Sequence, residues 1–362
     1  MNARSIVRKL DELSLLIATT SPSVIIVCES WLHPGISDDS LSLQGFNLLR
    51  CDRIDRVGGG VCMWIRSDLA CSRVTLLSLP SSVEAIVIKI PRIKLLLISA
   101  YIPPNISAPV QKDISEFFTL ILDQELSLCP DLKMMICGDF NTFDSRIFEQ
   151  NFSLYNCVKA PTRQASFLDQ IWISCNLRDF YNDEAVIGPP LDSSDHQTVF
   201  LFSNQSFCKV KKIVKLWDFR RSNVDRFLYL LSITNFSSIL ESGCCVDELC
   251  QVFYEHLDVA MSFVPSSYVM LSTSDKPWIT PLLKHLINER WKAFRGKDWR
   301  LYQHYKDKVK REIKKAKTTW ARRQISSSKH IWKVVNEIRG SKRSCNLQTL
   351  INEFGSKESM LA

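Results

Sequence analysis

The sequence predicts a mixed α/β fold followed by a basic helical segment. Short apolar runs bounded by Gly, Pro, Ser and Asn recur from residue 24 to residue 202, as is typical of buried strands. Two longer stretches in this part, 5–18 and 110–128, carry apolar residues at helical spacing. Many strands with few crossover helices indicate a mixed α/β domain.

The elements of this domain follow in order along the chain. Ser21-Pro22 stops the first helix, the glycine turn 58–60 feeds a strand, and Pro91 separates two further strands. Polar residues fall where strands end, which is where α/β folds place their chemistry. The expected strands are 24–28, 61–65, 83–90, 95–100, 133–137, 167–174 and 197–202.

The composition changes after residue 202. We expect an α/β domain over 1–202, a partly helical linker over 203–275, and a basic helical segment over 276–343 that is broken at Gly296. Residues 344–362 form a tail. A chain of 362 residues suits two domains rather than one.

Charge is distributed unevenly. The net charge is +8, yet residues 276–343 hold 21 Lys and Arg against 5 Asp and Glu. The first 275 residues therefore carry a net negative charge. An acidic N-terminal part and a basic C-terminal part indicate two parts with different functions, and the basic part is suited to bind nucleic acid.

Membrane and secreted classes are not favoured. No apolar run reaches the roughly 18 residues that span a bilayer, and the first residues lack the apolar stretch of a secretory signal. The 13 cysteines are scattered and form no CxxC pair, which is typical of a reducing compartment without a zinc finger. We expect the nucleus and cytoplasm and no membrane partner.

The sharpest local motif is Gly138-Asp139-Phe140-Asn141 at the end of a buried strand. In an extended chain, residues two apart face the same side, so Asp139 and Asn141 are expected to converge. A carboxylate that orients or deprotonates water, beside an amide that holds a phosphate oxygen, suits a phosphodiester site. An ordinary Asx turn after a strand accounts for the same four residues equally well.

Four further positions carry weaker signals. His196, next to Asp195, is a candidate for a general base or a cation, although a lone histidine is more often structural. Glu29 closes an apolar strand, where a charge needs a partner or a cation. Asp169 lies inside an apolar strand, and Tyr101 alone looks like a packing tyrosine.

The order of these residues carries more information than any one of them. Together they resemble the endonuclease/exonuclease/phosphatase superfamily, whose fold is a two-sheet α/β sandwich like that of DNase I. Within it, the first 202 residues most resemble CR1/Jockey-type endonucleases of non-LTR (LINE) retrotransposons. The motifs that carry the resemblance are Asn2-Ala3-Arg4, Glu29-Ser30-Trp31, Cys51-Asp52-Arg53 with Gly58-Gly59-Gly60, Tyr101-Ile102-Pro103-Pro104, Gly138-Asp139-Phe140-Asn141, Thr162-Arg163 with Leu168-Asp169, and Ser194-Asp195-His196.

The resemblance implies a role for each matched residue. Asp139 would position the attacking water, Asn141 and Tyr101 would contact the phosphate, and His196 would stabilise the developing charge. Asp169 would orient His196, and Glu29 and Asn2 would bind the metal. Asp195 would help to place the metal or His196. The residues that would contact DNA are Thr162, Arg163 and Ser194. The implied cofactor is Mg²⁺ or Mn²⁺, which prefers carboxylate oxygens.

One feature departs from the family. A strand normally precedes the Asn motif, whereas here Asn2 is the second residue. We therefore expect a missing sheet edge or a poorly held Asn2, as in a truncated gene model or a decaying copy.

The basic segment resembles the linker that leads to the reverse transcriptase in these elements. Its charge favours DNA or the element's RNA as a ligand, whereas its tryptophans are better explained by internal packing. An intact element would continue into the polymerase, which is absent here. The cations expected to bind nucleic acid are Lys310, Arg311, Lys314, Lys315, Lys317, Arg322 and Arg323.

The leading hypothesis is a metal-dependent endonuclease that nicks target DNA and leaves a 3′-hydroxyl to prime reverse transcription. One alternative is a catalytically impaired remnant that only binds nucleic acid. Another is an apurinic-site endonuclease or a phosphatase of the same superfamily.

Overall fold

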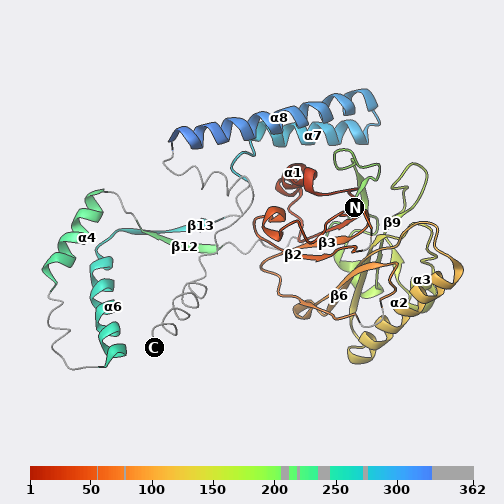
Figure 1. Cartoon of the computed structure of the whole chain (residues 1–362), viewed down its shortest axis with the longest axis horizontal. Helices are drawn as coiled ribbons and strands as arrows, with labels where there is room; N and C mark the ends of the chain where they lie inside the picture. Colours follow the sequence, from red (N-terminus) through yellow and green to blue (C-terminus); the bar gives the residue numbers. More distant parts are fainter. Residues whose placement is uncertain are drawn as a thin grey trace. The chain divides into compact units, whose positions relative to one another are not determined.

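The computed structural model describes residues 1–54, 56–76, 79–204, 212–217, 221–234, 245–271 and 276–327. The expected tail 344–362 lies outside the described residues. The chain divides into two compact units, of which one combines 1–207 with 275–362 and the other is 208–274. The first unit is therefore built from two stretches of sequence that the second interrupts (Figure 1).

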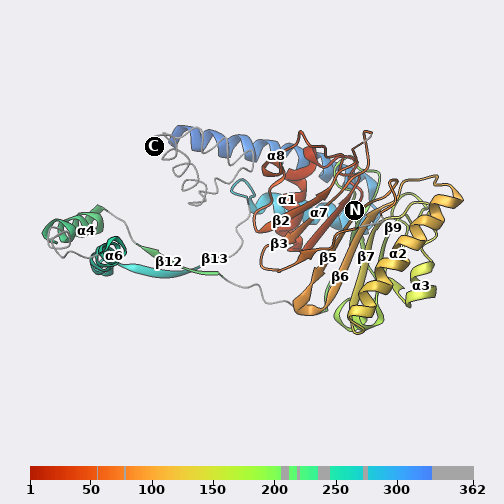
Figure 2. The same ribbon diagram turned by 60° about the horizontal axis from the view of Figure 1, so that its bottom comes forward.

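Two sheets face each other in the first unit, as Figure 2 shows. β6 and β7 are parallel, and the other ladders of both sheets are antiparallel. The larger sheet has the order β4 (Ser72–Arg73), β5 (Glu84–Ile90), β6 (Leu95–Tyr101), β7 (Lys133–Asp139), β9 (Asp169–Ile173), β8 (Tyr155–Asn156). The smaller has the order β1 (Val24–Cys28), β3 (Val61–Arg66), β2 (Phe46–Cys51).

Alternating side chains build a layer on each side of the sheets. Met63 and Ile65 of β3 point between the sheets toward Ile86 of β5, whereas Trp64 faces outward. Helices α2 (Ala108–Leu128) and α3 (Ile147–Phe152) cover the outer face of the larger sheet (Figure 2). The two-sheet α/β sandwich expected from the sequence is confirmed.

The outer face of the smaller sheet is covered by α1 (Leu10–Thr20), which follows the 3-10 turn η1 (Val7–Lys9). Leu13 and Leu16 pack on the sheet, whereas Leu15 points to the other side of the helix. There it meets α7 (Pro281–Arg295) and α8 (Trp299–Ser327), which pack against each other. The basic segment thus adds a further layer to the sandwich.

The remaining elements are short or belong to the second unit. β10 (Val186–Gly188) pairs with β11 (Thr198–Phe200), and the 3-10 turns are η2 (Asp38–Leu41), η3 (Pro91–Ile93) and η4 (Cys175–Phe180). In the second unit β12 (Lys212–Trp217) pairs with β13 (Ser266–Leu271), and α4 (Arg221–Ile233) contacts α6 (Val246–Ser262).

Of the two expectations for the start of the domain, a poorly held Asn2 is wrong, whereas a missing sheet edge stays a prediction. Asn2 is 2% exposed and forms a parallel bridge with Cys28 at the end of β1. The backbone N–H of Ala3 donates to Cys28 O at 2.9 Å, and that of Cys28 donates to Met1 O at 2.9 Å. No helix among the described residues is long and apolar enough to cross a bilayer.

Candidate active site

Four strands deliver their polar residues to one rim of the sandwich. β6 and β7 end side by side, with Tyr101 opposite Asp139 in the register. β9 begins there, with Asp169 opposite Asp139 on the other side. Glu29 follows the last residue of β1 directly. The sheet topology therefore gathers residues that are far apart in the sequence.

Gly138 makes the close approach of β6 and β7 possible. A Cβ atom at this position would lie 1.8 Å from the carbonyl oxygen of Ala100, which no packing adjustment accommodates. The glycine before Asp139 is thus required by the neighbouring backbone and fixes where the carboxylate stands.

Asp139 is fully buried at the centre of the site. Its Oδ2 accepts a hydrogen bond from Asn2 Nδ2 at 2.8 Å, and its Oδ1 accepts one from the backbone N–H of Asn141 at 3.2 Å. Burial and the nearby Asp169 carboxylate raise the pKa of Asp139 to about 6, despite the opposing effect of His196. A carboxyl group with that pKa is suited to take a proton near neutral pH.

Asn141 is near Asp139, but for a different reason than strand alternation. The strand ends at Asp139, and Asn141 takes a left-handed conformation with φ 45°. Its side-chain amide donates to Ile102 O at 2.7 Å. The Asx turn and the site geometry therefore coexist, and the expectation of a continuous extended face is wrong.

His196 and Asp169 form a buried pair. The Nδ1 atom of His196 lies 2.7 Å from Asp169 Oδ2, and both side chains are at most 4% exposed. Burial works to lower the pKa of His196, but the hydrogen bond and charge of Asp169, helped by Asp139 and Asp195, raise it overall. The arrangement favours the protonated form of the His196 imidazole.

Thr162 and Ser194, expected at the DNA surface, are buried beneath this pair. Thr162 Oγ1 accepts from the backbone N–H of Asp169 at 3.1 Å. Ser194 Oγ donates to Asn2 O at 2.7 Å and accepts from the backbone N–H of His196 at 3.1 Å. Both hydroxyls have their hydrogen bonds inside the protein, so they position the site instead of facing a ligand.

Glu29 is held by two aromatic donors. Tyr101 OH donates to Glu29 Oε1 at 3.0 Å, and Trp31 Nε1 donates to Glu29 Oε2 at 3.4 Å. Glu29 and Trp31 both have positive φ values, 48° and 54°. The strained backbone turns the carboxylate toward Tyr101, whose pKa is raised by its burial and by the Glu29 charge.

Asp195 faces outward between two arginines. Its Oδ2 lies 2.7 Å from an Arg163 nitrogen and 3.1 Å from an Arg4 nitrogen. Burial acts to raise the pKa of Asp195, but these cations and a backbone hydrogen bond lower it overall. Asp195 therefore stands with Arg163 at the partly exposed border of the site.

The donor set fits a hard divalent cation held by few protein ligands. Among the described residues, Glu29 and Asp139 form no ion pair with Lys or Arg, and Asp169 Oδ1 is buried without a hydrogen-bond partner. No described group of three or more His, Cys, Asp or Glu is arranged to bind a metal. Mg²⁺ commonly uses one or two carboxylates and several waters, which matches a site of this kind.

The cations expected to bind nucleic acid divide into two kinds. Lys317 pairs with Asp11 at 2.7 Å and Lys310 with Asp192 at 3.4 Å, so both tie α8 to the rest of its unit. The others, Arg311, Lys314, Lys315, Arg322 and Arg323, are exposed on α8.

From the sequence, no role was assigned to the ion pair between Arg53 and Glu84, which lies near the site. Arg53 binds Glu84 through two bonds of 2.6 and 2.9 Å, and its guanidinium lies 5.3 Å from the Tyr101 ring centre. The exposed indole of Trp31 was also not assigned. The dipeptides Asp52-Arg53 and Ser30-Trp31 were the only sequence signals for them.

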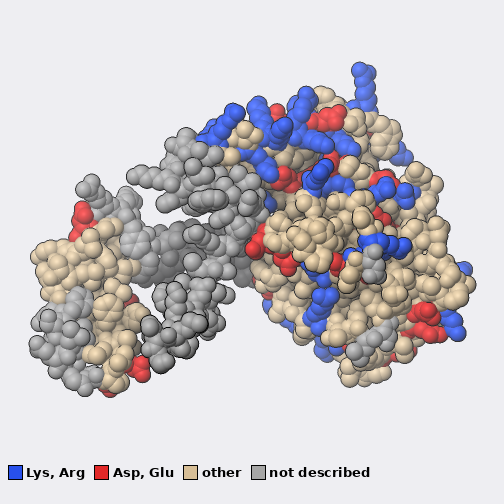
Figure 3. Space-filling model, viewed as in Figure 1, with Lys and Arg blue, Asp and Glu red and all other residues tan. Residues whose placement is uncertain are grey.

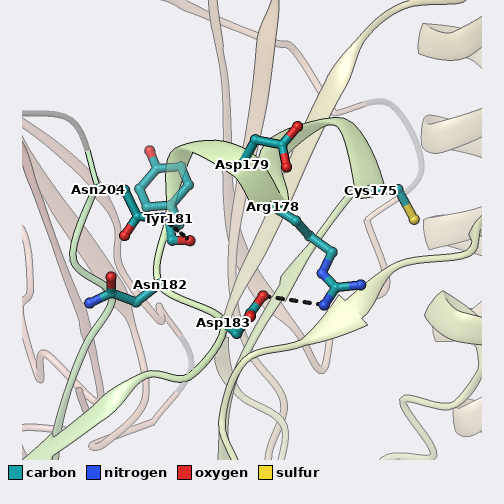
Figure 4. A pocket seen from close by; sticks show the side chains of 7 residues that line it. All are labelled: Cys175, Arg178, Asp179, Tyr181, Asn182, Asp183 and Asn204. Carbon is teal, nitrogen blue, oxygen red and sulfur yellow. Dashed lines mark hydrogen bonds and ion pairs between the residues drawn. The ribbon is translucent and has the colours of Figure 1, made fainter.

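A separate hollow of about 720 Å³ lies at the opposite end of β9 (Figure 4). Arg178 pairs there with Asp183 at 3.2 Å and stacks on Tyr155 at 4.6 Å, so its charge already has partners. None of the expected site residues lines this hollow. Its lining residues are Cys175, Arg178, Asp179, Tyr181, Asn182, Asp183 and Asn204.

Comparisons with known proteins address the same part of the chain. The sequence profile of the Endonuclease/Exonuclease/phosphatase family matches residues 1–196. No curated protein sequence matches the chain.

Solved structures of similar fold share little sequence with this chain. The endonuclease domain of TRAS1, a telomere-specific non-LTR retrotransposon, is 15% identical, with 56% of this chain and 94% of that chain covered and a TM-score of 0.43. The 3′ phosphatase NExo from Neisseria is 14% identical, with coverage of 56% and 97% and a TM-score of 0.43. The human Nocturnin catalytic domain is 13% identical, with coverage of 54% and 86% and a TM-score of 0.41.

Proposed function

The chain belongs to the endonuclease/exonuclease/phosphatase family, and on that basis we propose that it is a divalent-metal-dependent DNA endonuclease of a CR1/Jockey-type non-LTR retrotransposon. It nicks one strand of target DNA and leaves a 3′-hydroxyl from which the element's RNA is reverse transcribed. The observation that carries the proposal is the buried Asn2–Asp139 contact beside the Asp169–His196 pair.

Asp139 acts as the base in this reaction. With a pKa of about 6 it is ionised at neutral pH, yet it accepts a proton more readily than an ordinary aspartate. It takes a proton from the attacking water as the new O–P bond forms. The P–O3′ bond breaks, and O3′ takes up a proton from solvent, which yields the 3′-hydroxyl and a 5′-phosphate.

His196 stabilises the charge that develops on the phosphoryl oxygens. Asp169 accepts from Nδ1–H, which leaves Nε2–H to donate to a phosphate oxygen. Thr162 and Ser194 fix the backbone of Asp169 and His196, so they are positioning residues. Asn141 and Tyr101 contact the phosphate, and Arg163 the DNA backbone.

Glu29 and Asn2 would hold the metal, which supplies charge neutralisation for the phosphate when bound. Asp195, between its two arginines, acts on the orientation of the His196 loop. The buried and hydrogen-bonded Asn2 supports a catalytic site over a remnant that only binds nucleic acid.

Nicking of supercoiled plasmid with Mg²⁺ tests the proposal. We expect Asp139→Ala and His196→Ala each to lower the rate by about 10²-fold or more, the effect of removing one stabilising group. Asp144→Ala and His33→Ala are matched controls, because both side chains are exposed, and they should keep the parent rate. A polymerase should extend the nicks without prior phosphatase treatment.

Other substrates separate the alternatives. Cleavage confined to duplexes with an abasic site would replace the proposal by an apurinic-site endonuclease. Hydrolysis of phosphate monoesters by a chain that leaves plasmid intact would replace it by a phosphatase.

A further inference from the structure

Within the first unit, the helical hairpin α7–α8 is fixed to α1 by an apolar core of its own. Leu15 of α1 is fully buried in this cluster, on the face of α1 that points away from the sheet. The other buried members of the cluster are Trp278, Leu283, Leu286, Ile287, Val309 and Ile313.

Polar and aromatic contacts fix how the hairpin is oriented. Arg290 is 3% exposed and pairs with Glu12 of α1. The Trp291 ring lies 5.1 Å from that of Phe200 and occupies the space that a side chain at Gly188 would fill. The hairpin is therefore rigidly held against both α1 and β10–β11.

The outward face of α8 carries an excess of positive charge. The helix contains ten Lys and Arg against two Asp and Glu. Arg311 and Lys314 are exposed and make no ion pair with any described residue, and Lys315 has only a 4.0 Å contact with Glu312. Figure 3 shows Lys and Arg atoms gathered along this edge of the molecule, over α8.

This charge continues toward the candidate active site. Lys310 of α8 lies 3.4 Å from Asp192, in the same loop as Asp195 and His196. Arg4 and Arg163 flank Asp195. Lys310 thus joins α8 to the loop that carries His196.

The aromatic residues of α8 favour duplex over single-stranded nucleic acid. Tyr302 is buried, and Tyr305 and Trp320 pack on the apolar cluster. Trp299 is exposed, but it begins the helix and lies roughly 18 Å along the axis from Arg311, so it offers no stacking surface beside the exposed cations. Single-strand binding sites combine cations with stacking aromatics, whereas a duplex is held through its phosphates. A helix of 29 residues is about 43 Å long and can follow roughly 12 base pairs.

We propose that the outward face of α8 binds the phosphate backbone of the double-stranded DNA that flanks the nicked phosphodiester. This inference rests on the proposed function for the identity of the DNA as target. It assigns the task to Arg311, Lys314 and Lys315, and it leaves Lys317 as part of the packing of the hairpin.

Equilibrium binding by the full-length chain in EDTA tests the inference without any cleavage. The probes are a labelled 30-base-pair duplex and one of its single strands, titrated at several salt concentrations. In the triple variant Arg311→Ala/Lys314→Ala/Lys315→Ala, the slope of log K against log salt for the duplex should fall in magnitude by about 2.7, which is three phosphate contacts.

The triple variant Arg92→Ala/Lys133→Ala/Arg178→Ala is the matched control, because it removes the same charge at the opposite rim of the larger sheet. It should leave the slope unchanged. An equal effect of both triple variants, or a loss confined to the single strand, would overturn the inference. If the triple variant lowers the slope for the duplex but the parent chain does not nick DNA, the result supports DNA binding by α8 and contradicts the proposed function.

Discussion

The ion pair between Arg290 and Glu12 predicts that one conservative substitution, Glu12→Gln, lowers the free energy of unfolding by several kcal/mol. The Arg290 side chain is 3% exposed and that of Glu12 12% exposed, so water cannot replace the carboxylate. Glu12→Gln keeps the shape but leaves the guanidinium buried without a counter-charge. Removing one partner of a buried ion pair lowers the free energy of unfolding by about 3–5 kcal/mol. We expect a loss near the lower end for Glu12→Gln, because glutamine still accepts a hydrogen bond.

Two further variants separate charge from packing. In Glu12→Gln/Arg290→Met no charge remains buried, so stability should return to within about 1 kcal/mol of the parent. Asp11→Asn breaks the pair with Lys317, whose side chains are 36% and 28% exposed, and should cost about 0–1 kcal/mol.

Urea unfolding followed by tryptophan fluorescence measures these differences, because Trp278 and Trp291 lie in the affected contacts. The reasoning is refuted if Glu12→Gln costs less than about 1 kcal/mol, or if the double variant is no more stable than the single one.

Two predictions concern titration in the candidate active site. Asp169→Asn removes the main influence that raises the pKa of His196, so the high-pH limit of nicking should move to lower pH; an unmoved pH–rate profile would contradict the cationic role of the histidine. The pKa of Asp139, about 6 against an ordinary 3.8, means that its contribution to stability is greatest below pH 3.8 and is lost as pH rises through 6. In EDTA, the stability of Asp139→Asn relative to the parent should therefore rise by about 2 kcal/mol between pH 4 and pH 7.5 in urea unfolding; a difference that does not change with pH would contradict this.

The strands that position the site follow from local sequence signals. The apolar runs before Glu29 and Asp139 predict β1 and the start of β7, because short apolar runs bounded by turn residues are typical of buried strands. β2 was not predicted, since Phe46–Cys51 mixes polar and apolar residues without alternation and is only partly buried. Its pairing with β3 depends on a partner that local sequence does not reveal.

Side-chain direction was harder to predict than backbone position. Thr162 and Ser194 look like surface hydroxyls in the sequence, and only the tertiary hydrogen bonds to Asp169, Asn2 and His196 turn them inward. The packing of α7–α8 on α1 had one available signal. The run Leu13-Ser14-Leu15-Leu16 is apolar on more than one face of a helix, which is typical of a helix covered on two sides.

The contact between α1 and α7 has a consequence for biosynthesis. Glu12 and Arg290 are separated by 278 positions, and the second unit is translated between them. At the 5–20 residues per second of protein synthesis, the Leu15 face of α1 stays uncovered for roughly 14 to 56 s on the ribosome. The nascent chain therefore exposes an apolar helix face for that interval, during which a chaperone or a premature contact can occupy it.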